Sequence, residues 1–397
     1  MAVLVDLTLM PKLREYGAFD INACFNCGNC TAICPLTDEQ ATFPRRLIRY
    51  AQVGMKDELA ASKELWACYA CGECSVTCPR QAEPADFMAA ARRWAIASYD
   101  HTHIARTLYL RPIVGMAIAV ALALFFALFM YAAHGPQDSQ SLAIFQFIPE
   151  GLIHDTGVVL MIVVFLAGLV GVGTMVRRIA RAESIGVRSL VGSRAALRRT
   201  VLALWVALIV DGLGQRRYRK DCETPEAQPA WYRRRWFLHG AAMWGFLGLL
   251  AATILDYGLA LTGIKATGTP VPIWYPVRLL GTLAGILLIY GTSMLIVDRV
   301  RRSHRSVMHS VPADWTLLAL LWVTGVTGFA LELALYLPDA PAWGYWVFLF
   351  HVAIAMELVI LAPFMKLAHA VYRPAALFFL ELARTPQPQG TVSPPLT

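Results

Sequence analysis

The stretch CFNCGNCTAICP at residues 24–35 decides the fold of the N-terminal region, and it returns as CYACGECSVTCP at residues 68–79. Both copies follow the pattern C-x2-C-x2-C-x3-C-P, which is typical of chains that hold two 4Fe–4S clusters. A cubane cluster needs one thiolate at each of four iron corners, and three cysteines two residues apart can wrap one face of it. In this pattern the fourth cysteine binds the other cluster, so the two sites interlock.

The eight motif cysteines therefore divide into two sets of four. One cluster is assigned to Cys24, Cys27, Cys30 and Cys78, and the other to Cys68, Cys71, Cys74 and Cys34. Zinc is the first alternative, but a zinc ribbon does not repeat four cysteines with a terminal proline. Disulfides are the second alternative, and they need an oxidising compartment, to which nothing in the sequence points.

The composition indicates an integral membrane protein that carries a soluble head. Of the 397 residues, 57% are apolar and only 16% are charged, which is far from the balance of a globular domain. Spanning the hydrocarbon core takes about 20 apolar residues, and six stretches meet this requirement. They are residues 112–133, 152–176, 236–262, 276–298, 314–337 and 343–371.

The distribution of lysine and arginine predicts the orientation of these spans. Residues 177–235 carry fourteen and residues 299–313 carry four, whereas residues 134–151 and 338–342 carry none. Because basic loops stay in the cytoplasm, we place both termini and the cysteine motifs on the cytoplasmic side of the inner membrane. The net charge of +8 then reflects topology, and no nucleic-acid partner is expected.

A shorter apolar stretch, residues 201–210, lies between two groups of arginines and is too short to cross the bilayer. Apolar and basic residues in one short segment are typical of a helix that lies on the membrane surface. We therefore expect an interfacial helix near residues 195–214.

Helical patterns fill the rest of the N-terminal region, and strand patterns are absent. An early proline and a late glycine predict a helix over residues 43–54, and further helices are expected over residues 57–66 and 83–99. The predicted fold is therefore all-α. It consists of an α-helical ferredoxin domain at residues 1–105, expected to fold separately, a six-span membrane domain at residues 106–382, and a disordered tail at residues 383–397.

Histidines inside membrane spans are costly and indicate functional sites. His239 opens the third predicted span and His369 closes the sixth, so both lie at the cytoplasmic level. Two imidazoles at one depth suit the axial positions of one haem b. His351 shares the sixth predicted span with His369 and lies 18 residues before it, which is five helical turns or about 27 Å.

A second haem at His351 has no obvious second ligand. Leucine stands at position 249, ten residues past His239, where a ligand for an outer haem would lie. His154, at the outer start of the second span, is the nearest candidate by depth. The alternatives are that His351 binds a five-coordinate haem or lines a quinone site. The sequence predicts one haem b and leaves the second open.

The two parts of the chain resemble two known families. The first hundred residues, with paired motifs around a helical linker, resemble the small iron–sulfur subunit of heterodisulfide reductase. Residues 152–371 resemble the cytochrome b family of the nitrate reductase gamma subunit, in which two haem ligands lie eighteen residues apart on the last helix. His239, His351 and His369 fall on that pattern, and Leu249 departs from it. The order of the two parts is similar to that in the membrane subunits of quinone-interacting membrane-bound oxidoreductases.

These resemblances imply an electron-transfer subunit that is not catalytic alone. Electrons would pass between cytoplasmic flavin and iron–sulfur subunits and membrane quinone, by way of the two clusters and haem b. The implied soluble partner exchanges electrons with adenylylsulfate reductase in sulfur metabolism. Two alternatives stay open, namely a subunit of another heterodisulfide-reductase-like or sulfite-linked membrane complex, and a membrane anchor without haem.

Overall fold

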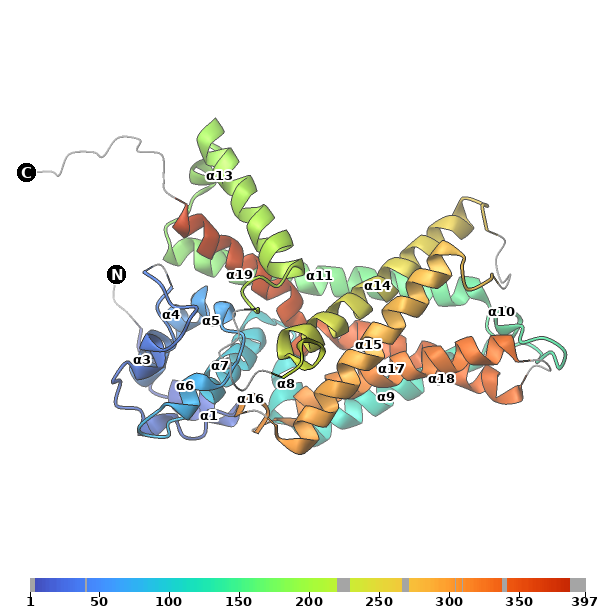
Figure 1. Cartoon of the computed structure of the whole chain (residues 1–397), viewed down its shortest axis with the longest axis horizontal. Coiled ribbons are helices and arrows are strands. Elements are labelled where there is room, and N and C mark those ends of the chain that lie inside the picture. The colour runs from blue at the N-terminus through green and yellow to red at the C-terminus, as the bar shows by residue number, and fades with distance from the viewer. Residues whose placement is uncertain are drawn as a thin grey trace, which may run out of the picture.

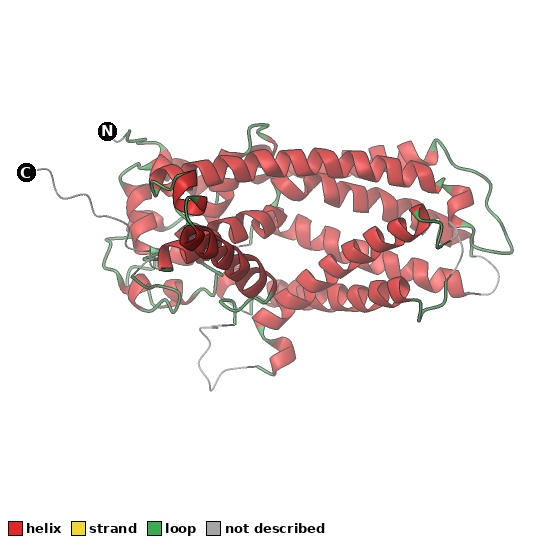
Figure 2. Ribbon diagram, turned by 90° about the horizontal axis from the view of Figure 1, so that it is seen from above, coloured by secondary structure: helices red, strands yellow, loops and turns green. Residues whose placement is uncertain are grey.

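The chain folds into helices joined by loops, as the sequence predicts. The computed structural model describes residues 4–39, 41–219, 229–265, 271–303, 305–308, 310–337 and 341–385. Within these ranges it contains no β-sheet, only an isolated bridge between Asp38 and Ala41, and Figure 2 shows long helices running from the head toward the far loops. The all-α fold is confirmed, whereas the predicted tail lies outside the described residues from position 386 onward.

Short helices build the head around the two cysteine motifs. In chain order they are α1 (Leu9–Glu15), η1 (Ile21–Ala23), α2 (Asn29–Ala32), α3 (Arg45–Gln52), α4 (Lys56–Ala60), α5 (Glu64–Ala67), α6 (Glu73–Val76), α7 (Pro84–Tyr99) and α8 (Ile104–Leu110). Pro84 occupies the first turn of α7, where its missing N–H costs nothing. The single helix expected over residues 57–66 is instead two helices, α4 and α5, because the chain turns at residues 61–63.

Six helices are long and apolar enough to cross a membrane, which agrees with the predicted number of spans. They are α9 (Pro112–Tyr131), α11 (Glu150–Ala182), α14 (Arg235–Leu261), α15 (Pro276–Arg301), α17 (Pro312–Tyr336) and α18 (Ala342–Leu361), the last extended by η5 (Ala362–Phe364). Two short helices, α10 (Ile144–Phe147) and α16 (Arg305–Met308), lie in the connections. Figure 1 shows the spans running together away from the head.

The sixth span is shorter than predicted, and this changes the placement of His369. Residues 343–371 were expected to form one helix, but α18 ends at Leu361 and gives way to the 3-10 turns η5 and η6 (Lys366–Ala368). Pro363 explains the break, since proline has no N–H to donate and its ring clashes with the carbonyl of residue 359. His369 begins a separate helix, α19 (His369–Arg384), so the expectation that it shares an axis with His351 is wrong.

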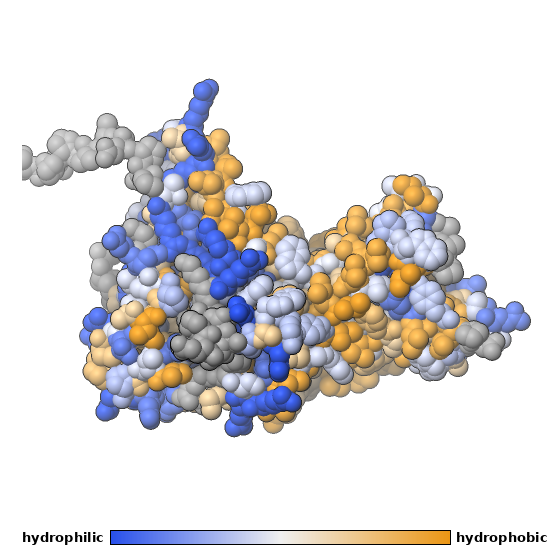
Figure 3. All heavy atoms as spheres, viewed as in Figure 1, coloured by the Kyte–Doolittle hydropathy of each residue, from blue (hydrophilic) through white to orange (hydrophobic). Residues whose placement is uncertain are grey.

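A projecting helix occupies the region expected to lie on the membrane surface. Helix α12 (Val187–Val191) leads into α13 (Arg194–Trp205), which continues as the π-helix η2 (Val206–Leu213). Figure 1 shows α13 crossing the direction of the spans, and Figure 3 shows an apolar flank on the side of the bundle and a hydrophilic flank toward the head. Exposed Val201, Trp205 and Leu208 contribute to the apolar side, which suits an interfacial helix.

We predict that residues 194–213 do not cross the membrane. A cytoplasm-dependent fluorescent reporter fused after Arg219 should fluoresce, because the preceding apolar segment lies in the interface and its basic neighbours stay in the cytoplasm. The same reporter fused after Ser139, which follows α9, should stay dark. A dark fusion at Arg219 would mean that the segment crosses and that the predicted orientation after it is inverted.

The head and the membrane bundle share one hydrophobic core instead of folding as separate units. Tyr372 of α19 packs its ring against Trp66 of α5 and Tyr99 of α7, with centroids 5.3 Å apart in both cases. On its other side, Gly171 of α11 leaves the room that the Tyr372 hydroxyl occupies, since a Cβ there would lie 2.2 Å away. The C-terminal helix therefore completes the core of the N-terminal head.

Ion pairs reinforce this junction where α11 extends beyond the membrane. Its 33 residues measure about 50 Å, against about 30 Å for the hydrocarbon core. The extension reaches the head, where Glu183 pairs with Lys63. On the opposite side of the head, Arg93 of α7 lies 3.3 Å from Asp314 at the start of α17. The head is thus fixed against the cytoplasmic ends of the spans.

Candidate metal centres

The two cysteine motifs have the same backbone conformation. Asn26 and Ala70, at equivalent positions, have φ of 68° and 60°, and the following Gly28 and Gly72 have φ of 94° and 98°. Left-handed backbone at two alternate positions turns the chain tightly around a centre and leaves N–H groups pointing inward. Each glycine then starts a short helix, α2 or α6. Both loops are shaped to surround a compact anionic group.

The described cysteines gather into two neighbouring sets. Cys34 comes together with the second motif, since it lines one cavity with Cys68, Cys71 and Cys74. Cys78 comes together with the first motif, because it interacts electrostatically with both Cys24 and Cys30. Cys74 also interacts with Cys30, so the two sets adjoin. These are the sets that the crossed pattern predicts, and the ligand assignment itself stays a prediction.

The spacing of the thiols suits a cluster better than a single ion. Within the described parts of the chain, no three His, Cys, Asp or Glu side chains converge closely enough to hold one metal ion. A cubane separates its four thiolates, because each binds a different iron. The eight motif thiols are unpaired, with none in a disulfide.

The backbone also provides hydrogen bonds to sulfur. The Ala70 N–H donates to Cys68 Sγ at 3.3 Å, and the Ala82 N–H donates to Cys78 Sγ at 3.4 Å. Burial raises the pKa of the Cys30 thiol to about 11, so this group ionises when a metal takes the place of its proton. The residues present fit two clusters held by buried thiolates with N–H donors around them.

The structure brings two of the predicted haem ligands together. His239 lies in the first turns of α14 and His369 is the first residue of α19, and their ring centroids are 6.0 Å apart. Two imidazoles that bind one metal from opposite sides, at bond lengths of about 2.0–2.1 Å, have their ring centres roughly 6 Å apart. The observed separation therefore fits a shared metal between the rings, with the remaining ligands supplied by a porphyrin.

The hydrogen bonds of both rings leave the required nitrogen available. His239 Nδ1 lies 3.1 Å from Gln215 Oε1, and His369 Nδ1 lies 2.6 Å from the carbonyl oxygen of Lys366. Both partners are acceptors, so each Nδ1 carries the proton and each Nε2 keeps a lone pair. Loss of water around the ring, together with the Arg373 and Lys366 cations, lowers the pKa of His369 to about 4. This ring is neutral at neutral pH, as a metal ligand must be.

Gln215 is a site residue that the sequence did not reveal. It follows the π-helix η2, has φ of 52° and is buried. π-helical turns are rare and often occur at functional sites, and this one ends where the Gln215 amide meets His239. Nothing in the local sequence pairs two residues 24 positions apart, so only the tertiary fold shows the contact. Lys366, the other acceptor, is held by Asp314 at 2.9 Å.

The other two candidate ligands have separate partners. His351 Nδ1 lies 2.8 Å from the hydroxyl of Thr327 on α17, whereas the ring of His154 packs against Tyr257 of α14 with centroids 4.3 Å apart. No ring contact joins His154 to His351 in the described part of the chain. Two membrane acids, Asp256 and Glu332, form ion pairs with Lys265 and Arg278.

Two family models match the chain. Residues 20–82 match the model described as 4Fe-4S dicluster domain, and residues 101–389 match the model described as Citrate utilization protein B. The first range contains both cysteine motifs, and the second contains all six spans together with α19. No solved structure matches the chain significantly.

Curated relatives match the two parts separately. A small subunit of the H(2):CoB-CoM heterodisulfide,ferredoxin reductase of Methanothermobacter thermautotrophicus is 36% identical over 62 residues, which is 16% of this chain and 34% of that protein. Citrate utilization protein B of Escherichia coli is 30% identical over 160 residues, 40% of each protein. The iron-sulfur subunit of the CoB–CoM heterodisulfide reductase of Methanopyrus kandleri is 36% identical over 56 residues, 14% of this chain and 29% of that protein. The chain therefore spans less than half the length of each of these relatives.

Proposed function

The chain belongs to the citrate utilization protein B family, and we propose that it is a membrane electron-transfer subunit linking soluble redox partners to membrane quinone. Its iron–sulfur domain is related to the iron–sulfur subunits of heterodisulfide reductases, which indicates electron transfer. The route into the membrane by haem b, the quinone and the identity of the partners belong to the proposal.

One observation carries the haem part of the proposal. The His239 and His369 rings lie 6.0 Å apart, and an acceptor holds each Nδ1 so that both Nε2 atoms are free to bind. The group would be haem b, because the sequence contains no C-x-x-C-H motif for covalent attachment. Gln215 and Lys366 would fix the orientation of the two rings and increase their basicity.

When bound, the clusters and the haem take up and release one electron at a time, whereas quinone takes two. The chain's own residues position these groups: eight thiolates hold the clusters, loop N–H groups donate to sulfur, and the histidine pair lies where the head meets the spans. No G-x-G-x-x-G stretch that would bind a dinucleotide is present in the sequence. Two-electron chemistry on a soluble substrate is therefore assigned to flavin and iron–sulfur partner subunits.

The finer part of the proposal concerns those partners. On the resemblance to quinone-interacting oxidoreductases, we place the complex next to adenylylsulfate reductase in sulfur metabolism. The match to heterodisulfide reductase subunits supports a partner of thiol–disulfide or sulfur chemistry, and a sulfite-linked complex is the competing assignment. Affinity purification from membranes, followed by identification of the co-purified flavoprotein, decides between them.

An optical spectrum of the purified protein tests the proposed function. We expect the reduced-minus-oxidised difference to show the sharp bands of a low-spin b-type haem, and a reduced naphthoquinone or benzoquinone should elicit the same bands. EPR of the dithionite-reduced sample should show two 4Fe–4S clusters. Clusters without haem bands would support the membrane-anchor alternative, and haem bands that no quinol produces would remove quinone from the proposal.

A further inference from the structure

An arginine joins the second cysteine motif to the histidine pair. Arg235 is the first residue of α14, one turn before His239. Its guanidinium donates to the carbonyl oxygen of Ala70 at 2.8 Å and to that of Cys71 at 3.2 Å. The sequence placed Arg235 in a basic group that indicates topology, but the structure directs it onto the loop that wraps the Cys68 set.

Two further arginines converge on the same loop. Arg373, one turn after His369 on α19, donates to the carbonyl oxygen of Ala67 at 3.4 Å. Arg92 of α7 donates to the carbonyl oxygen of Cys68 at 2.6 Å. Arg235 and Arg373 thus extend the helices of the two histidines to one loop, and both contribute to the positive field around the pair.

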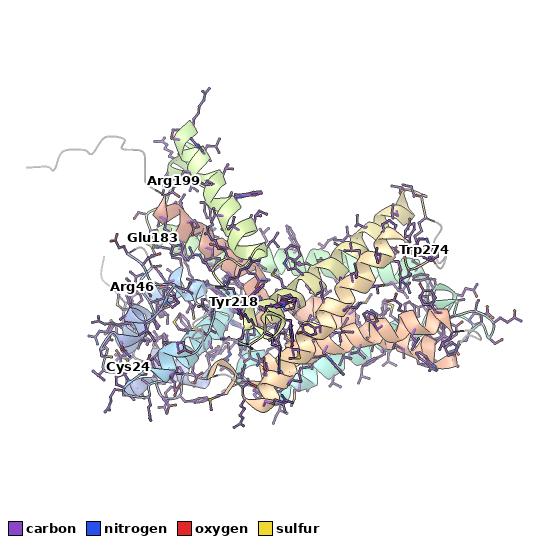
Figure 4. The ribbon with its side chains drawn as sticks, viewed as in Figure 1. Cys24, Arg46, Glu183, Arg199, Tyr218 and Trp274 are labelled. Atoms are coloured by element: carbon purple, nitrogen blue, oxygen red, sulfur yellow. The ribbon has the colours of Figure 1, made fainter. Side chains whose placement is uncertain are left out.

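A continuous aromatic contact follows the same direction. Tyr69, which lies between Cys68 and Cys71, packs edge-on against Tyr218 with ring centroids 5.3 Å apart. Tyr218 in turn stacks on His239 at 4.9 Å. Figure 4 places Tyr218 where the head meets the bundle, with Cys24 toward the end of the head remote from the spans. Packed side chains therefore fill the space between the second motif and the haem-level histidine.

The loop of the first motif makes its described hydrogen bonds within the head. Asn26 donates to Gln52, Gln52 donates to the carbonyl oxygen of Cys24, and Arg45 donates to Asn26 at 3.0 Å. Cys27 is exposed, and Phe25 beside it is 60% exposed. This set of thiols is open to solvent, whereas the second set is covered by the arginines and the tyrosines.

We infer that the three centres are arranged in a fixed order, with the Cys34–Cys68–Cys71–Cys74 site adjoining the histidine pair and the Cys24–Cys27–Cys30–Cys78 site at the outer end. Arg235, Tyr69 and Tyr218 form the junction between the inner site and His239. The inference rests on the proposed function, because it orders the carriers of that route. Single electrons move from site to site, each donor being oxidised as its acceptor is reduced, and no bond or proton is transferred. A soluble partner exchanges electrons at the exposed Cys27 loop.

Replacing single arginines and measuring midpoint potentials tests this order. Adding an electron makes a centre more negative, so a nearby cation stabilises the reduced form and raises the potential. In Arg235→Gln the potentials of the haem and of the inner cluster should both fall, while that of the outer cluster stays unchanged. Arg235→Lys keeps the charge and should recover most of the lost potential. Cys71→Ser and Cys27→Ser variants identify which EPR signal belongs to which cluster.

Arg45→Gln is the matched control at the other end of the head. Because Arg45 is exposed, its removal should cause a smaller fall, limited to the outer cluster. A haem potential that moves with Arg45, or an outer cluster that moves with Arg235, would overturn the order. If the wild-type protein holds no haem, the proposed function fails by its spectrum, whereas the effect of Arg235→Gln on only one of the two cluster signals still tests the junction.

Discussion

His369→Ala is expected to abolish the low-spin haem spectrum and leave both iron–sulfur signals in place. The substitution removes one of two rings whose centroids lie 6.0 Å apart, and a five-coordinate haem cannot keep the spectrum of a six-coordinate one. The clusters should remain, because Tyr372, which packs on Trp66 and Tyr99 of the head, is unchanged. Haem content by pyridine haemochrome and EPR of the same sample measure both effects.

His351→Ala is the matched control for this prediction. It also removes an imidazole from the C-terminal part of the chain, but its Nδ1 contacts Thr327 on α17, away from the His239–His369 pair. The variant should keep the low-spin bands of that pair. If His369→Ala retains the full spectrum, or His351→Ala loses it, the assigned ligand pair is wrong.

Cys34→Ser and Cys78→Ser are expected to damage opposite clusters from those of their own motifs. Cys34 belongs to the first motif but lines the cavity of Cys68, Cys71 and Cys74, whereas Cys78 interacts with Cys24 and Cys30. The Cys34→Ser spectrum should therefore resemble that of Cys71→Ser, and the Cys78→Ser spectrum that of Cys27→Ser. Each variant should lose up to half of the cluster iron.

EPR with iron counting distinguishes the crossed arrangement from the uncrossed one. In the uncrossed case Cys34→Ser would resemble Cys27→Ser, because all four cysteines of one motif would hold one cluster. Simultaneous loss of both signals in each single variant would instead mean that the two sites fold only together. Either outcome would refute the independent crossed sites.

Repetition and apolar run length made most of the fold predictable. The C-x2-C-x2-C-x3-C-P repeat specifies two similar loops, and the structure gives them matching left-handed residues at Asn26 and Ala70. Six runs of about 20 apolar residues predict six spans because the thickness of a bilayer fixes the length of a crossing helix. Such signals lie within the segment they describe, so one sequence is enough to read them.

The features that the sequence did not reveal depend on contacts between distant segments. Gln215 meets His239, Arg235 meets the loop of Cys71, and Tyr372 meets Trp66 only after the bundle forms. No local periodicity encodes these pairs. The break before His369 is a different kind of error, since Pro363 stands in the sequence and proline inside a helical pattern ends or kinks the helix. The depth of His369 was expected correctly to match that of His239, but on the basis of one continuous helix.

The position of α19 at the end of the chain has a consequence for the order in which the protein matures. A ribosome makes roughly 290 further residues after Cys78 before it reaches His369, which takes about 15–60 s at 5–20 residues per second. All eight motif thiols are therefore available for iron early, whereas the histidine pair, and the Tyr372 ring that fills the core of the head, exist only near the end of translation. Biogenesis should accordingly proceed from cluster insertion to haem insertion, and chains that stop before residue 369 should accumulate as loosely packed, haem-free products for membrane proteases to remove.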